Sequence, residues 1–148
     1  MNMLLDHKKA RFNYEIADRL EAGIELSGIE VKSLRMGRGS LDGAYVIIRG
    51  GEAYLVNAFI PPYQENNTPR DYEPRRNRRL ILTKNEIKKL SNVDEGKNLT
   101  IVPVSMYTKN NRIKVEVAVA KSKKKYDKRE TIKTREVNRE LRREMKRG

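Results

Sequence analysis

The C-terminal quarter of the chain, residues 121–148, has too few apolar side chains to take part in a folded core. It holds 13 lysine and arginine residues against 5 aspartates and glutamates, so most of the net charge of +13 lies there. Ordering a backbone costs roughly 1–2 kcal/mol per residue, and such a segment has little apolar surface to offset that cost. We therefore expect a globular domain over residues 1–120 and a tail over residues 121–148 that is disordered until a polyanion neutralises it.

The tail nevertheless has the residue spacing of a conditional helix. In a helix written from Thr131, arginines four residues apart form one ridge and glutamates form the next, and such pairs contribute about 0.2–0.5 kcal/mol each. The apolar stripe beside them is too narrow to hold the helix without a partner, so we predict a helix that forms on binding. The arginine ridge is Arg135, Arg139, Arg143 and Arg147, the glutamate ridge is Glu136, Glu140 and Glu144, and the stripe is Ile132, Val137, Leu141 and Met145.

Composition narrows the partner and excludes several kinds of site. A sequence pI near 10.0 indicates an acidic polymer or surface as the partner. There is no cysteine for a disulfide or a thiolate metal site, and we expect the single histidine, His7, to be solvated. No apolar run approaches the roughly 20 residues that cross a bilayer, and the N-terminus does not resemble a secretory leader. We expect a cytoplasmic protein with no membrane partner, no metal and no cofactor.

Five segments of the first 120 residues have the composition and alternation of β-strands. Gly50-Gly51 is a tight hairpin turn between two of them, and the last two are joined near Asn110-Asn111. Pro103 indicates an edge or a bulge in one strand, and Gly23 indicates a bulge or bend in another. The expected strands cover residues 12–26, 44–49, 52–60, 99–107 and 112–120.

Two capping boxes, Ser27–Glu30 and Thr83–Glu86, predict the starts of short helices. One helix follows the first strand and the other lies between the third and fourth, which is not the strand–helix alternation of a parallel sheet. We therefore predict a mainly β protein with a small antiparallel barrel. The five-stranded OB fold, which binds oligonucleotides, is the natural model for it. Two or three short helices and the basic C-terminal tail complete the architecture.

Two clusters of basic residues are candidate RNA contacts. Lys32, Arg35 and Arg38 are spaced three apart and can share the outer face of the first helix, although a solvated face explains them equally well. The segment Arg75–Arg79 ends a long loop and carries four guanidinium groups, which bind phosphate in bidentate fashion and stack on bases. A solubilising loop is the alternative, but arginine rather than lysine at all four positions favours nucleic acid.

Motifs for catalysis are missing from the sequence. It has no glycine-rich phosphate loop, nucleophile elbow, His–Glu metal helix or Cys–His pair. Asp42, Asp71 and Asp94 lie in turn-like contexts rather than together, as a metal-dependent nuclease would need. A membrane-surface role for the tail is disfavoured because its stripe lacks Trp, Phe or a broad Leu face. We expect a binding protein rather than an enzyme.

Four groups of residues, in the same order along the chain, resemble the SsrA-binding protein (small protein B) family. They are Lys8–Tyr14 with Glu21–Leu26, then Gly28–Gly37, Pro74–Leu82 and Ala120–Arg129. The resemblance implies a bacterial protein with an OB-type barrel that binds the tRNA-like domain of transfer-messenger RNA (tmRNA). It also implies delivery of that RNA to stalled ribosomes for trans-translation. The tail of such proteins enters the decoding site and the empty mRNA channel as a helix.

The resemblance also assigns expected roles to residues. Glu21 corresponds to a family glutamate implicated in RNA contact, while Ile81 and Thr83 stand where some members have Leu and Asn, and Ser122 replaces the usual glycine. We expect one barrel face to bind tmRNA and the tail to bind ribosomal RNA, with a protein that is monomeric when free. The alternative is a generic ribosome-associated OB-fold RNA-binding protein. The expected RNA-binding residues are Lys8, Lys9, Arg11, Tyr14, Glu21, Lys32, Arg35, Arg38, Arg75, Arg76, Arg78, Arg79, Ile81 and Thr83; the expected ribosome-binding tail residues are Lys123, Lys124, Lys125, Tyr126, Asp127, Lys128, Arg129, Arg135, Arg139 and Arg143.

Overall fold

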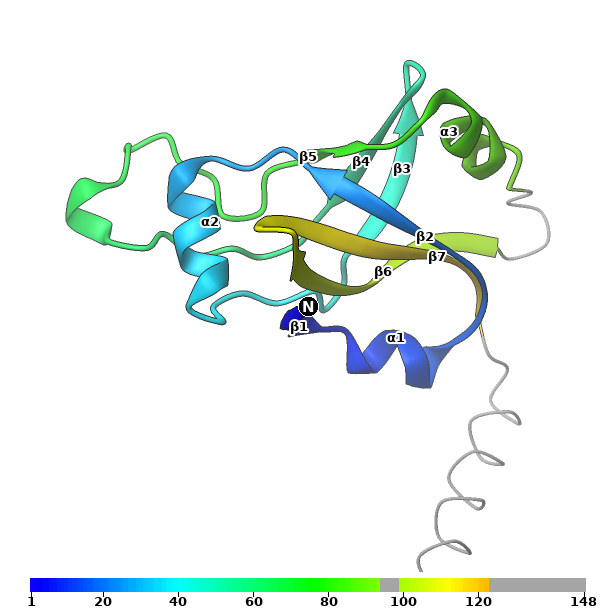
Figure 1. The fold of residues 1–148 in the computed structure, drawn as a ribbon, viewed down its shortest axis with the longest axis horizontal. Helices are drawn as coiled ribbons and strands as arrows, with labels where there is room; N and C mark the ends of the chain where they lie inside the picture. Colours follow the sequence, from blue (N-terminus) through cyan, green and yellow to red (C-terminus); the bar gives the residue numbers. More distant parts are fainter. Residues whose placement is uncertain (94–98, 123–148) are drawn as a thin grey trace, which may run out of the picture.

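Antiparallel strands follow one another around a closed ring. The computed structural model describes residues 1–93 and 99–122, and in that part of the chain the ring runs β6-β3-β4-β5-β2-β7 and closes where β7 pairs with β6 (Figure 1). A further strand, β1, pairs with β6. The predicted mainly β, OB-like architecture is confirmed. The strands are β1 (Asn2–Asp6), β2 (Tyr14–Ile24), β3 (Tyr45–Arg49), β4 (Glu52–Val56), β5 (Arg78–Ile81), β6 (Leu99–Lys109) and β7 (Arg112–Ser122); the helices are α1 (Lys8–Asn13), α2 (Gly28–Arg35), α3 (Lys84–Ser91) and the 3-10 turn η1 (Glu65–Asn67).

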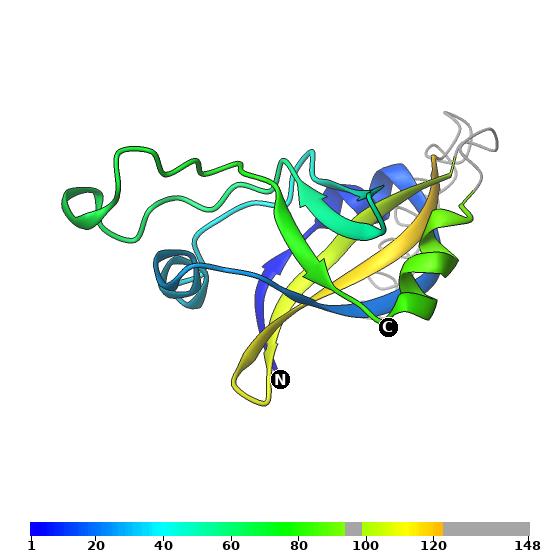
Figure 2. The same ribbon diagram turned by 90° about the horizontal axis from the view of Figure 1, so that it is seen from above.

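The five predicted strands are present, and the structure adds β1, β5 and α1. Both added strands are short, so neither shows a clear alternation of apolar and polar residues. In addition, β5 begins with two arginines of the stretch that was expected to be a loop. Their strand conformation comes from pairing with β6 and with β4 and β2. The strand predicted over residues 52–60 ends earlier, at Val56, because Asn57 has a φ of 65°. Ala58 and Ile60 are still fully buried in the core, and the middle of the 57–77 loop then projects from the barrel, with η1 far from it (Figure 2).

The predicted turns are confirmed, and one predicted bulge is in a different place. Gly50 and Gly51 have φ of 59° and 76°, and Asn110 and Asn111 have 52° and 63°, so both hairpins turn through left-handed residues. The β6–β7 register shifts at Pro103, as predicted. Gly23 does not mark a bulge, since the shift in β2 lies between Ile16 and Arg19.

Gly23 instead allows three strands to come close together. It pairs with Ile81 of β5 on one side and with Lys114 of β7 on the other. A Cβ at this position would lie 3.2 Å from the Cβ of Ile81, closer than almost any ordinary contact. The missing side chain therefore lets β5 approach β2 closely enough for the two strands to pair.

The main core fills the ring, and a smaller cluster lies beneath α1. Val115 and Val117 point inward from β7, as the alternation predicted, and are fully buried. Ala120 is also buried, because Ala10 of α1 packs against it from outside. The prediction for His7 is wrong: it is buried, and its Nδ1 lies 2.7 Å from the carbonyl oxygen of Pro103. The short β1–α1 connection fixes that ring against the β6 bulge.

Both predicted capping boxes are confirmed, but one of their glutamates has a second role. Glu30 accepts from the backbone N–H of Ser27, as Glu86 does from that of Thr83. Glu30 is also fully buried and accepts from Arg78 Nε at 2.6 Å and from Arg76 Nε at 3.1 Å.

Arg78 extends this ion cluster to the base of the projecting loop. Its guanidinium is fully buried and donates to the carbonyl oxygens of Ala58 and Pro74, both at 2.9 Å. One carboxylate therefore joins the first turn of α2 to the two ends of the 57–77 loop, through Arg78 and Arg76. Because the burial of a charge is costly unless it is paired, the cluster depends on all three side chains.

The first prediction concerns the charge of Glu30. Glu30→Gln keeps the shape and a capping acceptor but leaves the buried Arg78 guanidinium without its counter-charge, so we expect a loss of about 3 kcal/mol in the free energy of unfolding. Glu86→Gln is the matched control, because Glu86 is also the third residue of a capped helix but is not paired with an arginine in the ion pairs of the described residues. Urea denaturation measures both. Equal losses for the two variants would show that the arginine cluster adds nothing beyond the cap.

The second prediction is a pH dependence with the same origin. Burial raises the pKa of Glu30, but bonds from Arg76, Ser27 and Arg78 outweigh it and hold the pKa below the ordinary 4.5. A lowered pKa in the folded state gives stability that is present above 4.5 and is lost as the pH falls through the lowered value. Urea midpoints from neutral pH down to about pH 3 should fall less steeply for Glu30→Gln than for the native chain. If the urea midpoints of the two proteins fall in parallel as the pH is lowered, Glu30 is not the source of this pH dependence.

Candidate nucleic-acid interface

A row of outward positions crosses four strands of the barrel. The strand registers place Ile81 of β5, Gly23 of β2, Lys114 of β7 and Tyr107 of β6 side by side. Residues opposite one another in an antiparallel sheet share a face, and so do residues two apart on one strand, which adds neighbours of the row on β2 and β6. We call this surface the hairpin face; it consists of Glu21, Gly23, Ile81, Lys109 and Lys114, together with Tyr107, which is itself buried.

Glu21 is fixed in the hairpin face by two neighbours on β6. The Tyr107 hydroxyl donates to its carboxylate at 2.5 Å, and Lys109 Nζ lies 3.4 Å away. The Tyr107 bond, with help from Lys109, holds the pKa of Glu21 below its usual range, while burial and the bond to Glu21 raise the pKa of Tyr107. At neutral pH the carboxylate is therefore ionised and oriented, with oxygen lone pairs left to accept from a ligand.

Helix α2 adds cations at the tip of the β6–β7 hairpin. Arg35 donates to the carbonyl oxygen of Asn111 at 3.4 Å, and α2 lies beside that end of the hairpin (Figure 1). Lys32 lies over the ring of Tyr63 at 5.8 Å, and Arg38, which follows the helix end, donates to the Tyr63 carbonyl oxygen at 3.4 Å. The hairpin face therefore continues into the exposed basic side of α2.

The cations of α1 lie elsewhere, at the root of the tail. Tyr14 begins β2 and pairs with Ser122, the last residue of β7, whereas Glu21 lies seven residues further along β2, roughly 23 Å for a straight strand. Lys8, Lys9 and Arg11 precede Tyr14 on α1, where Lys9 pairs with Asp42 and Arg11 with Asp6. The expected single face bearing α1, Glu21 and the loop arginines is therefore two separate surfaces.

The four loop arginines are mostly structural. The expectation that Arg78 contacts RNA is wrong, because its side chain is fully buried against Glu30. Arg76 also pairs with Glu30, and Arg79 pairs with Glu25 and Glu52. Arg75 differs, since its guanidinium lies over the ring of Phe59 at 5.1 Å and donates to backbone and side-chain oxygens of Asn57.

The two positions singled out after the loop have different environments. Ile81 is 52% exposed, an unusual position for a large apolar side chain, and lies in the hairpin face. Thr83 accepts from the backbone N–H of Glu86, so its hydroxyl caps α3. Lys109, Lys114 and Tyr107 were not among the expected site residues. The outward parity of Lys114 on β7 was the available signal, but placing it opposite Gly23, on the face that carries Glu21, needs the register.

The described residues offer no other obvious chemistry. Residues 1–93 and 99–122 hold no group of three His, Asp or Glu side chains placed to bind a metal ion, and no helix there is long and apolar enough to cross a membrane. The expected tail residues from Lys123 onward lie outside the described part of the chain. Lys121 and Ser122, however, are the last residues of β7, two positions past the expected domain boundary.

Known proteins resemble this chain over nearly its whole length. The family model for SmpB protein matches residues 4–147. An SsrA-binding protein of Gloeothece citriformis is 48% identical, with 98% of this chain and 94% of the relative covered. Another, of Mycoplasmoides gallisepticum, is 49% identical, with 96% and 99% covered. A solved structure described as "tmRNA-SmpB: a journey to the center of the bacterial ribosome" has a TM-score of 0.68 and 40% identity, covering 82% of this chain and 85% of that one. The chain belongs to the SmpB protein family, that of the SsrA-binding proteins.

Proposed function

We propose that the protein binds the tRNA-like domain of tmRNA, the SsrA RNA, through the hairpin face and delivers it to stalled ribosomes for trans-translation. The observation that carries this proposal is an ionised, oriented Glu21 with Lys109 and Lys114 beside it, on a family-typical barrel that places Arg35 at the tip of the same β6–β7 hairpin. It acts by binding rather than by catalysis. Because its proposed partners are tmRNA and the bacterial ribosome, the protein acts in the bacterial cytoplasm.

Each part of the face has a distinct task in RNA recognition. The lysines and Arg35 bind phosphate groups, which supply affinity that falls with salt. The Glu21 carboxylate accepts a hydrogen bond from a 2′-hydroxyl or from a base amino group. A phosphate has no such donor, so Glu21 favours contact with the sugar or with a base edge. Exposed Ile81 offers an apolar surface to a base splayed out of a loop.

The tail and α1 form the second binding element in this proposal. The α1 cations lie where β7 ends, so residues 8–11 and the tail start from the same place on the barrel. The tail, with its arginine ridge, binds ribosomal RNA in the decoding site and the empty mRNA channel. The hairpin face remains free for tmRNA at the same time.

The third prediction tests whether RNA binds at the hairpin face or only through the net positive charge of the protein. Lys109→Gln with Lys114→Gln should weaken binding to the tRNA-like domain about tenfold at low salt and lower the salt slope by about 1.5, because two phosphate contacts are lost. The matched control removes the same charge from α3, with Lys88→Gln and Lys89→Gln, both exposed. Fluorescence anisotropy over a salt series measures both variants, with ordinary tRNA as competitor.

Two outcomes would contradict the proposal. Equal weakening by both variants would mean that net charge, not the hairpin face, binds the RNA. Equal affinity for tRNA and the tRNA-like domain in the native chain would favour a generic ribosome-associated RNA-binding protein. Glu21→Gln refines the result, because it should reduce discrimination between the two RNAs more than it reduces total affinity.

The fourth prediction separates the two elements. Removal of residues 123–148 leaves β7 complete to Ser122, so affinity for the tRNA-like domain should change less than threefold at physiological salt, where the loss of distant charge is screened. Peptide tagging on stalled ribosomes should be abolished. Loss of tmRNA binding in the shortened protein would overturn the division between barrel and tail.

A further inference from the structure

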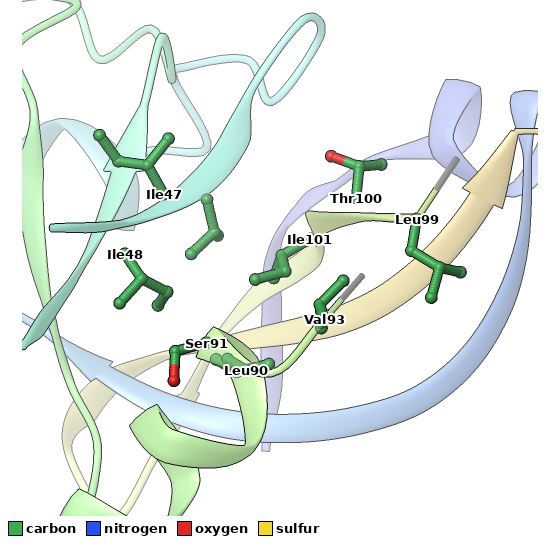
Figure 3. A pocket seen from close by; sticks show the side chains of 9 residues that line it. Ile47, Ile48, Leu90, Ser91, Val93, Leu99, Thr100 and Ile101 are labelled. Carbon is green, nitrogen blue, oxygen red and sulfur yellow. The ribbon is translucent and has the colours of Figure 1, made fainter. Parts of the chain in front are cut away.

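The barrel has an open groove at its most weakly paired seam. Among the described residues, strands β3 and β6 are joined by a single residue pair, Val46 with Ile101. A groove of about 630 Å³ opens there, with the end of α3 forming one wall (Figure 3). Partly exposed apolar side chains, including Ile47, Ile48, Val93 and Leu99, line it.

The chemistry of this groove does not suit RNA. None of the nine described residues that line it is charged, and seven of them are Val, Ile or Leu. RNA-binding surfaces need cations for phosphate and aromatic or guanidinium planes for bases. An apolar protein segment is the kind of occupant that such a surface stabilises.

The chain itself supplies such a segment beside the groove. Lys121 pairs with Leu99, a groove residue, so residues 123–148 follow a strand that lies directly beside the groove strand β6. Nine residues, 123–131, precede the first residue of the apolar stripe and can span up to about 30 Å. The stripe of Ile132, Val137, Leu141 and Met145 is too narrow to form a core by itself, and the groove offers matching apolar surface.

Tethering favours this occupant over a second copy of the protein. A segment attached by a short linker has an effective concentration in the millimolar range, without any new contact. A second copy must instead bring together two molecules that each carry a net charge of +13. We propose that, when no RNA holds the tail, its apolar stripe docks in the groove between β3, α3 and β6.

The chain's lack of cysteine allows a direct test. Arg142→Cys introduces a single thiol for a nitroxide label in the full-length protein, and methyl NMR then reads which side chains the label broadens. We expect strong broadening at Ile48, Val93 and Leu99. The Met3 methyl group serves as the remote reference. Met3 pairs with Tyr107, which lies six residues along β6 from the groove residue Ile101, or roughly 20 Å away.

Variants in the tail test the stripe without changing the barrel. Leu141→Ser with Met145→Ser in the labelled protein should lower the docking equilibrium constant about tenfold or more, because the apolar side chains no longer bury surface. Asn138→Ser, a polar change in the same segment, should leave the broadening unchanged. Added salt should preserve the broadening, since apolar docking is not screened, whereas RNA binding weakens.

Three results would overturn the proposal. Groove methyls that are no more broadened than Met3 would show that the tail does not dock there. Broadening that survives in the double serine variant would show that the stripe is not the contact. The last result comes from a mixture in which one protein carries the nitroxide but is invisible to NMR, and the other has visible methyl groups but no nitroxide. Broadening of the groove methyls in this mixture would show that a second copy occupies the groove.

Discussion

The buried cluster of Glu30, Arg76 and Arg78 is the interaction on which the arrangement of the binding surface depends. Glu30 caps the first turn of α2, and the two arginines tie it to the ends of the 57–77 loop. The basic side of α2 and the loop residue Tyr63 are therefore held in one arrangement by a single carboxylate. An apolar core could pack as tightly, but it could not connect backbone carbonyls on both ends of a loop.

Binding capacity is distributed over two surfaces because one long strand lies between them. β2 carries Tyr14 at the root of the tail and Glu21 in the hairpin face. The same strand pairs with β7, which begins beside the hairpin tip that contacts α2 and ends at Ser122, where the tail starts. The barrel thus presents its cations in two places, as the proposed binding of two RNA partners at once requires.

The parts of the fold that depend on local chemistry were predictable from sequence. Capping boxes, Gly50-Gly51 and the alternation of β7 specify their conformations within a few residues. β1 and β5 were not predictable, because they are strands only through their partners. The role of Arg78 was misjudged for a related reason: an arginine run looks the same whether its guanidinium groups meet RNA or a glutamate 48 residues away. Register, which places Ile81 and Lys114 on either side of Gly23 and so on the same face as Glu21, is likewise a property of the closed ring.

The pairing of Tyr14 with Ser122 has a mechanical consequence for the assembled complex. Since Ser122, the last residue of β7, is held in the sheet, the residues that follow it start from a fixed point on the barrel. The hairpin face is fixed to the same strands, with Glu21 opposite Glu116, six residues before Ser122. In the proposed function, the barrel is therefore a spacer of set length, roughly 20 Å along β7, between the hairpin face and the start of the tail. An insertion within β7 would change that spacing while leaving both binding surfaces chemically intact.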